Sequence, residues 1–429
     1  MIFEEQSEIR KILAGTKLPK FAMVRQIFPD DAIPDVAAYL NEKLTDPEIS
    51  GRIKPGMTVA MTGSSREIAN MPLILRELAR FVKAHGAKPY IVPAMGSHGG
   101  ATDEGQRELL EGYGITEEAC ECPIFSSMET VRVGEVDGDE VRMDKFAHDA
   151  DAIILVGRIK AHTAFRGPYE SGMAKMMAIG LGKREGADSL HKLGFSKMGE
   201  RMPRFAKVVF DNSNIVFGVA PIENEHDHTC RIEVLKREEI FDKEPDLLKY
   251  AKSRMPRIIL PETDVLIVRE IGKNFSGSGM DPNVTGTFAT PYADGGIKKE
   301  RVVVLDLSEE THGNYLGLGN ADMCSYRAFS KARTNGCYAN MLTSTVLRVG
   351  KIPMILEDDE LALRAAVKML TDGDREHPRM IYLKNTLSLE NILVSEAQLD
   401  EVRQHPDMEI LEEPRYLNFD EKGNLLDFA

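Results

Sequence analysis

Apolar residues in the first half of the chain fall into short runs, with one longer amphipathic segment between them. The apolar run at residues 58–61 predicts a strand. A helix is predicted over residues 72–86, because its apolar residues recur on one side and it begins with proline and ends with glycine. Further short apolar runs, typical of buried strands in a mostly parallel sheet, lie at residues 90–94, 151–156, 207–210 and 215–219. The pattern predicts an α/β domain.

The same alternation begins again after two prolines within residues 254–262. We therefore place a domain boundary near residue 258, giving domains 1–257 and 258–429. The second series predicts strands at 264–269, 301–307, 380–383 and 408–411, and helices through 321–333 and 357–371. The expected fold class is α/β, with two α/β domains and the active site in the cleft between them.

One long segment of the second domain shows no periodicity. Residues 271–296 are rich in Gly, Ser, Asn and Pro and follow a predicted strand. Long loops in compact domains are usually functional or disordered, and ligand sites in open α/β sheets gather at the carboxyl ends of strands. We expect this loop to contribute to a ligand site.

Charge and composition narrow the classes of partner. The formal net charge is −14 and no dense block of Lys and Arg occurs, which argues against a nucleic-acid partner. No apolar run is long enough to span a bilayer, and the N-terminus lacks the pattern of a secretory signal, so we expect a cytoplasmic protein without a membrane partner. Five cysteines, an odd number spread over the chain, indicate reduced thiols.

Four reactive side chains lie among glycines and other small residues: His98, His162, Lys175 and His191. Such surroundings let the backbone approach a ligand closely. The common motifs of phosphate loops, zinc proteases, serine hydrolases and dinucleotide-binding domains are missing. The sequence thus indicates a site built by histidines and a lysine, outside those common classes.

The order of these residues resembles a known family. Gly96-Ser97-His98 follows a predicted strand, His162 precedes a small-residue run into Ala174-Lys175, and His191 lies sixteen residues beyond the lysine. This arrangement is similar to the nickel-pincer-nucleotide isomerases, the group typified by lactate racemase. The likeness extends over both domains and is strongest from about residue 55 to 195, as in a branch divergent from lactate racemase itself.

The resemblance implies roles for the four residues. Lys175 would bind a nickel pincer nucleotide through a thioamide link, and His191 would be the protein ligand to nickel. His98 and His162 would be the paired acid/bases. A neutral imidazole suits square-planar Ni(II), and a lysine amine can be derivatised where its surroundings favour the neutral form.

Two further residues are expected to bind the substrate carboxylate. Arg66 occupies the place of the family's arginine, although Gly63 replaces the family's acidic residue and Glu67 its proline. In the second domain, Lys273 is expected to replace a lysine that the family has in a loop resembling Asp281-Pro-Asn283. These departures indicate a substrate other than lactate, such as a longer or sugar-derived acid.

The expected function is therefore racemisation or epimerisation of a small anionic 2-hydroxy acid, through a transient 2-keto acid. A hydride would move to the cofactor while a histidine takes the hydroxyl proton. Pincer-nucleotide biosynthesis proteins are the expected partners for cofactor supply, and the oligomeric state is left open. The alternatives are a non-isomerase redox or binding protein on the same fold, and a zinc-dependent hydrolase using His98, His162 and His191.

Overall fold

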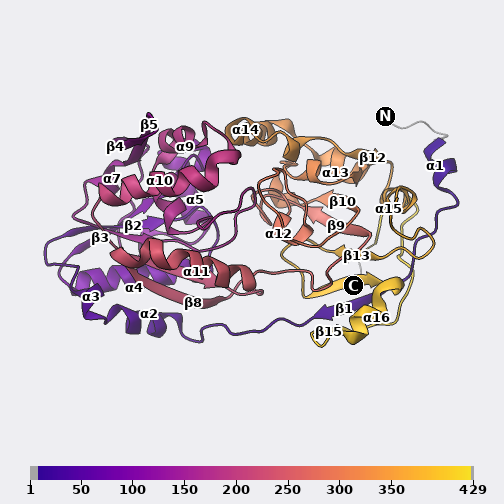
Figure 1. Cartoon of the computed structure of the whole chain (residues 1–429), viewed down its shortest axis with the longest axis horizontal. Helices are drawn as coiled ribbons and strands as arrows, with labels where there is room; N and C mark the ends of the chain where they lie inside the picture. Colours follow the sequence, from indigo (N-terminus) through magenta and orange to yellow (C-terminus); the bar gives the residue numbers. More distant parts are fainter. Residues whose placement is uncertain (1–7, 427–429) are drawn as a thin grey trace. The chain divides into compact units, whose positions relative to one another are not determined.

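The computed structural model describes residues 8–426. The chain has an α/β fold and divides into two compact units (Figure 1). One unit runs from Pro29 to Met255, and the other combines the N-terminal segment through Phe28 with the chain from Pro256 onward. No helix within the described residues is long and apolar enough to cross a membrane.

The Pro29–Met255 unit is built on a five-stranded sheet. Its first four strands are parallel and the last is antiparallel to its neighbour. In spatial order they are β3 (Lys88–Pro93), β2 (Thr58–Gly63), β6 (Ala152–Val156), β7 (Ile215–Glu223) and β8 (Thr229–Lys236).

Helices cover both faces of this sheet, because alternate strand residues point to opposite faces and both sets are apolar. Met61 and Ile154 belong to the core under one group of helices, and Ala60 and Ile153 to the core under the other. The first group comprises α2 (Val36–Leu44), α3 (Pro47–Ser50), α4 (Met71–Ala84), α5 (Asp103–Gly112) and α6 (Glu117–Cys120). The second comprises α8 (Met173–Lys175), α9 (Lys183–His191), α10 (Met198–Asp211) and α11 (Ile240–Ser253), beside the hairpin of β4 (Thr130–Val136) and β5 (Asp139–Asp144) with α7 (Lys145–His148).

Most of the strands and helices expected for this unit are present, but the strand expected at residues 207–210 is wrong. Those residues form the last turn of α10. Met202, Phe205 and Val209 are buried at helical spacing, so the apolar run is the end of an amphipathic helix. A four-residue apolar run is compatible with either structure, and only the preceding residues decide between them.

The second unit contains an eight-stranded mixed sheet. The strands from β12 to β13 are parallel, while β14, β1 and β15 join antiparallel. Their order is β12 (Met354–Leu356), β11 (Met323–Ser325), β10 (Arg301–Leu307), β9 (Val265–Ile271), β13 (Met380–Leu383), β14 (Asn391–Ser395), β1 (Phe21–Gln26) and β15 (Met408–Ile410). Its helices are α1 (Glu8–Leu13), α12 (Pro282–Thr285), α13 (Tyr326–Lys331), α14 (Thr334–Ser344), α15 (Asp359–Lys368) and α16 (Leu399–Gln404). The first strand of the chain is thus paired within the unit formed by the C-terminal half.

The helix expected over residues 321–333 is only partly present. Met323–Ser325 form the short buried strand β11, and α13 begins at Tyr326. The long segment 271–296 is irregular except for α12, a helix of four residues. Asp281 caps α12 by accepting a hydrogen bond from the Asn283 backbone N–H.

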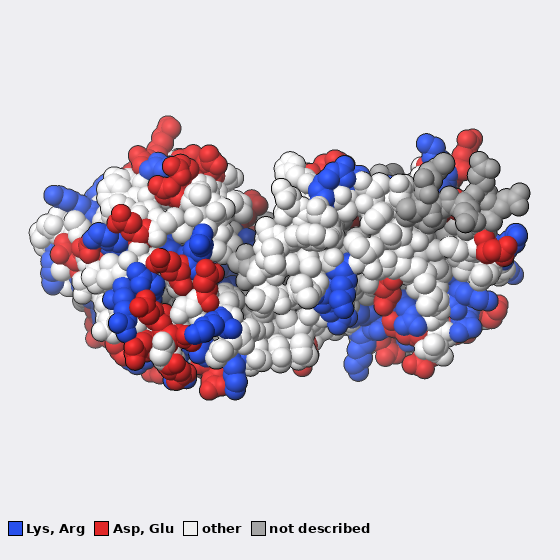
Figure 2. Space-filling model, turned by 90° about the horizontal axis from the view of Figure 1, so that it is seen from above, with Lys and Arg blue, Asp and Glu red and all other residues white. Residues whose placement is uncertain are grey.

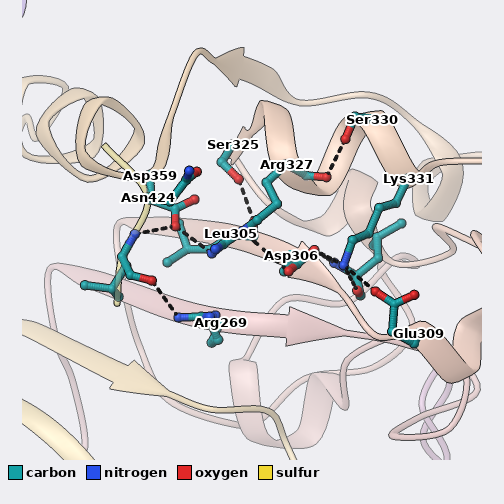
Figure 3. Close-up of polar contacts among 12 residues, drawn as sticks. Arg269, Leu305, Asp306, Glu309, Ser325, Arg327, Ser330, Lys331, Asp359 and Asn424 are labelled. Carbon is teal, nitrogen blue, oxygen red and sulfur yellow. Dashed lines mark hydrogen bonds and ion pairs between the residues drawn. The ribbon is translucent and has the colours of Figure 1, made fainter. Parts of the chain in front are cut away.

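A polar network at the carboxyl end of β10 ties the C-terminal segment to the sheet (Figure 3). Arg327 contacts Asp306 and donates to the fully buried Asp359 at 2.5 Å. Asp359 also accepts from the Leu425 backbone N–H, and Arg269 donates to the Leu425 carbonyl. The charges in this network are therefore largely matched within the unit.

Candidate functional site

Three loops of the Pro29–Met255 unit carry candidate residues at the same edge of its sheet. Arg66 follows β2, His98 follows β3 and His162 follows β6. These three strands are parallel neighbours, so their carboxyl ends lie together. The sequence places Lys175 and His191 in the connection between β6 and β7.

His98 is exposed and is oriented by a serine of the neighbouring loop. Its Nδ1 lies 2.5 Å from the Ser65 hydroxyl oxygen, and Ser65 directly precedes Arg66. A hydroxyl can donate or accept a hydrogen bond by rotation. The contact therefore holds the ring in place while allowing either nitrogen to carry the proton, which an acid/base residue requires.

A backbone hydrogen bond selects one tautomer of the neutral His162 ring. The Ala164 backbone N–H donates to its Nδ1 at 3.1 Å, and its ring packs against Phe165 with centroids 4.5 Å apart. A neutral ring with an accepting Nδ1 carries its proton on Nε2. Burial, followed by electrostatic interactions with Lys175 and with His191, lowers the pKa of His162 well below its ordinary value. The neutral form is therefore favoured in the cofactor-free chain.

Lys175 ends α8, the short helix that continues directly into the π-helical turn η2 (Met176–Gly180). Burial, and then the positive charge of Arg66, lowers its pKa to about 8. Among residues 8–426, no carboxylate forms an ion pair with this amine. At pH 7.5 about a quarter of it is unprotonated, against about one part in a thousand for an ordinary lysine. The amine is thus suited to covalent derivatisation near neutral pH.

His191 presents one nitrogen as a potential metal donor. Its Nδ1 lies 2.7 Å from the Ala187 carbonyl oxygen, which can only accept, so Nδ1 carries the proton. The lone pair is then on Nε2, the arrangement found in histidines that bind metals. Burial is the largest cause that lowers the pKa of His191, which keeps the ring neutral. The Phe195 ring lies 5.7 Å from His191 and 6.1 Å from His162, between centroids.

Two buried glutamates support this region, and neither is among the residues expected from the sequence. Glu244 of α11 accepts from the Ala174 backbone N–H at 3.0 Å, at the start of the helix that carries Lys175. A Cβ on Gly172 would lie 2.2 Å from Glu244 Oε1, so only glycine fits there. Glu170 accepts from the His162 backbone N–H at 2.7 Å and from the Lys252 ammonium at 2.6 Å.

No local pattern could have identified Glu244, because it lies in an ordinary amphipathic helix and its contact spans 70 residues of sequence. Burial raises its pKa to about 8. The carboxyl group therefore stays protonated at neutral pH and acts as a neutral anchor.

The two expected carboxylate-binding residues lie in different units. Arg66 is exposed, and its charge lowers the pKa values of Lys175 and His162, which places it in their electrostatic environment. Lys273 lies in the other unit, where its ammonium donates to the Gly277 carbonyl at 2.7 Å within its own loop. The role of Lys273 in substrate binding stays a prediction.

Within the described part of the chain, no group of three or more His, Cys, Asp or Glu side chains is placed to hold a metal ion. His98, His162 and His191 therefore do not form the three-ligand set that a catalytic zinc site uses. A pincer nucleotide would bring most donors to nickel itself and would need one imidazole and one reactive amine from the protein. His191 Nε2 and the Lys175 amine fit that requirement.

The surface around this unit carries both signs of charge. On the face seen in Figure 2, Lys and Arg side chains are interspersed with Asp and Glu. Exposed ion pairs of this unit include Arg204–Asp137, 2.6 Å apart, and Lys207–Asp211. A large field of one sign is not seen on that face.

A family model described as a domain of unknown function (DUF362) matches residues 53–235. The matched segment begins just before β2 and ends within β8, so it includes all five strands of this sheet. It contains Arg66, His98, His162, Lys175 and His191 but not Lys273. The chain is similar to this family over that segment. No curated protein matches the chain.

Two solved structures are similar to the chain at low sequence identity. One is the lactate racemase apoprotein from Thermoanaerobacterium thermosaccharolyticum, with 13% identity and a TM-score of 0.46, covering 90% of this chain and 97% of that one. The other is a structural-genomics protein from Thermotoga maritima, with 14% identity and a TM-score of 0.47, covering 63% of this chain and 71% of that one.

Proposed function

We propose that this protein is a racemase or epimerase of a small 2-hydroxy acid and that it uses a nickel pincer nucleotide attached to Lys175. The observation that supports the proposal most is the environment of that lysine. Its amine has a pKa of about 8 and shares its electrostatic surroundings with Arg66, His162 and His191. Three cationic or basic groups around an unpaired amine favour an anionic ligand and a neutral lysine.

In this proposal each residue has one task. Arg66 binds the substrate carboxylate through its guanidinium group. His98 takes the proton of the substrate hydroxyl, since Ser65 accommodates either protonation state of its ring. His162 serves the opposite face of the substrate, and its Nε2 delivers or accepts the proton there. Two bases are required because C2 is inverted when its hydrogen returns to the opposite face of the transient 2-keto acid, so each face needs its own proton acceptor and donor.

Nickel would be held by His191 Nε2 and the nucleotide by Lys175. When bound, the cofactor supplies a reversible acceptor for the C2 hydrogen with its electron pair, which a protein side chain cannot provide. Glu244 supports this attachment by holding the first turn of α8. Derivatising Lys175 also removes a positive charge that lowers the pKa of His162. The attached state therefore favours proton uptake by this histidine more than the free chain does.

The test uses protein co-produced with pincer-nucleotide biosynthesis proteins and a panel of single-enantiomer 2-hydroxy acids, from lactate to longer and sugar-derived acids. Chiral chromatography follows inversion. We expect His98→Asn and His162→Asn each to reduce the rate at least a hundredfold with nickel retained. His377→Asn, on an exposed residue of the other unit, is the matched control and should keep full activity.

Full activity in both His98→Asn and His162→Asn would refute the two-base chemistry and favour the redox or binding alternative. Lactate as the fastest substrate would refute only the expectation of a longer or sugar-derived acid. Activity of nickel-free protein that zinc restores would instead support a hydrolase.

A further inference from the structure

A fully buried lysine lies eight residues beyond Lys175 and contacts three separate elements. The Lys183 ammonium donates to the Pro93 carbonyl at 2.5 Å and to Gln106 Oε1 at 3.0 Å, and lies 3.1 Å from Asp144 Oδ2. Both Lys183 and Asp144 have no exposed surface. Buried charges of this kind are costly unless they are paired, so the pairing must be specific.

The backbone of Lys183 is also unusual. Its φ is 51°, in the left-handed region that side chains other than glycine rarely adopt. Such a conformation persists only where the surrounding contacts hold it, and it is common at functional sites. Lys183 opens α9, the helix that ends at His191.

The lysine determines how the Gln106 amide is oriented. An ammonium can only donate, so the Gln106 carbonyl oxygen must face it and the NH₂ group must point the other way. That NH₂ group donates to the Gly96 carbonyl at 2.8 Å and to the His98 carbonyl at 3.3 Å. Without the ammonium, the amide is free to turn, and two carbonyls of the His98 loop lose their specified donor.

The loop is joined to the Lys175 segment by a second contact. The Gly96 backbone N–H donates to the Gly180 carbonyl at 3.1 Å. A Cβ on Gly180 would lie 2.7 Å from the Ala94 carbonyl oxygen, so the two backbones approach too closely for any other residue. Lys183 belongs to the segment that carries Lys175 and His191, and through Gln106 it connects this segment to the loop that presents His98.

We propose that Lys183 is a positioning residue whose buried ammonium, held by Asp144, orients Gln106 and thereby fixes the His98 loop against the Lys175 segment. The catalytic consequence rests on the proposed function, but the positioning itself does not. It can be measured in the cofactor-free protein.

The first variant is Lys183→Met combined with Asp144→Asn, which removes both buried charges together. Asparagine can still cap α7, as Asp144 does by accepting from the Ala147 N–H. The second variant is Gln106→Glu, which keeps an acceptor for Lys183 but removes the donors to the loop carbonyls. The control is Arg184→Gln, at the exposed neighbouring position.

The readouts are the ¹H–¹⁵N signals of the His98 ring and hydrogen exchange of the His98 amide, which donates to the Met95 carbonyl. We expect both test variants to shift the ring signal and to speed amide exchange at least tenfold, while Arg184→Gln changes neither. In loaded enzyme they should lower kcat at least tenfold with KM changed less than threefold.

An unchanged His98 signal and unchanged exchange in a folded variant would overturn the proposal. If Lys183→Met/Asp144→Asn does not fold, Gln106→Glu alone decides in the same way. If the His98 signal shifts as expected but loaded wild-type protein inverts no hydroxy acid, the positioning role stands and the proposed function fails.

Discussion

Replacing Glu244 by glutamine should remove a pH dependence of stability that this side chain creates. The carboxyl group is buried, and its Oε2 accepts the Ala174 N–H while its Oε1 has no hydrogen-bond partner. Burial raises its pKa from 4.5 to about 8. Glutamine keeps an acceptor for Ala174 and has no charge to lose.

The sign follows from the two pKa values. Below pH 4.5 the carboxyl is protonated in both the folded and the unfolded chain, so its titration does not reduce the free energy of unfolding. Between pH 4.5 and 8 the folded protein keeps a proton that the unfolded chain has released, so the free energy of unfolding falls as pH rises. From pH 5 to pH 8 the loss attributable to Glu244 is about 3 kcal/mol, at roughly 1.36 kcal/mol per unit of pKa shift.

The assay is urea unfolding followed by circular dichroism at several pH values between 5 and 8, for wild type and Glu244→Gln. The difference between the two proteins isolates the contribution of Glu244 from other titrating groups. Asp246→Asn on the exposed side of the same helix is the matched control, since Asp246 is largely exposed and forms an ion pair with Lys249, the residue three positions along. If the difference in unfolding free energy between wild type and variant stays constant across this range, the pKa of Glu244 is not raised in the folded protein.

Three other changes have expected outcomes. Burial and then the Lys175 charge lower the pKa of His162, so Lys175→Met should raise this pKa toward its ordinary value in NMR titration; an unchanged pKa would mean that Lys175 does not contribute. Arg327→Leu leaves the buried Asp359 without its ion pair and should destabilise the protein by about 2–4 kcal/mol in urea unfolding; a loss below 0.5 kcal/mol would contradict the pairing in Figure 3. In native protein, iodoacetamide should label Cys230 first, because the other four cysteines are buried, and mass spectrometry after short exposure would detect any different order.

Local sequence patterns predicted those parts of the fold that depend on local periodicity. The strand at residues 58–61 and the helix over 72–86 are present as β2 and α4, because each carries its own apolar pattern and boundary residues. The pairing of β1 with β14 joins Phe21 to Ser395, and no local pattern records a contact over that separation. The strand predicted at residues 207–210 was wrong because four apolar residues fit both a strand and the end of a helix.

The candidate site was also only partly predictable from the sequence. Residue types and spacing pointed to His162, Lys175 and His191, and the pKa shifts of these groups show that they influence one another electrostatically. The contacts of Glu244 and Lys183 were not predictable, because they join residues that are distant in sequence and lie on different elements. The sequence alone does not show whether a charged residue is buried or exposed.

Attachment of the cofactor to Lys175 can be detected in a single preparation of the protein. Nickel content and intact mass are determined on protein co-produced with the pincer-nucleotide biosynthesis proteins, with peptide mapping around Lys175. We expect about one nickel per chain and a mass adduct on the Lys175 peptide, both missing in Lys175→Met. Neither nickel nor adduct, in cells where a lactate racemase is loaded by the same proteins, would contradict this attachment.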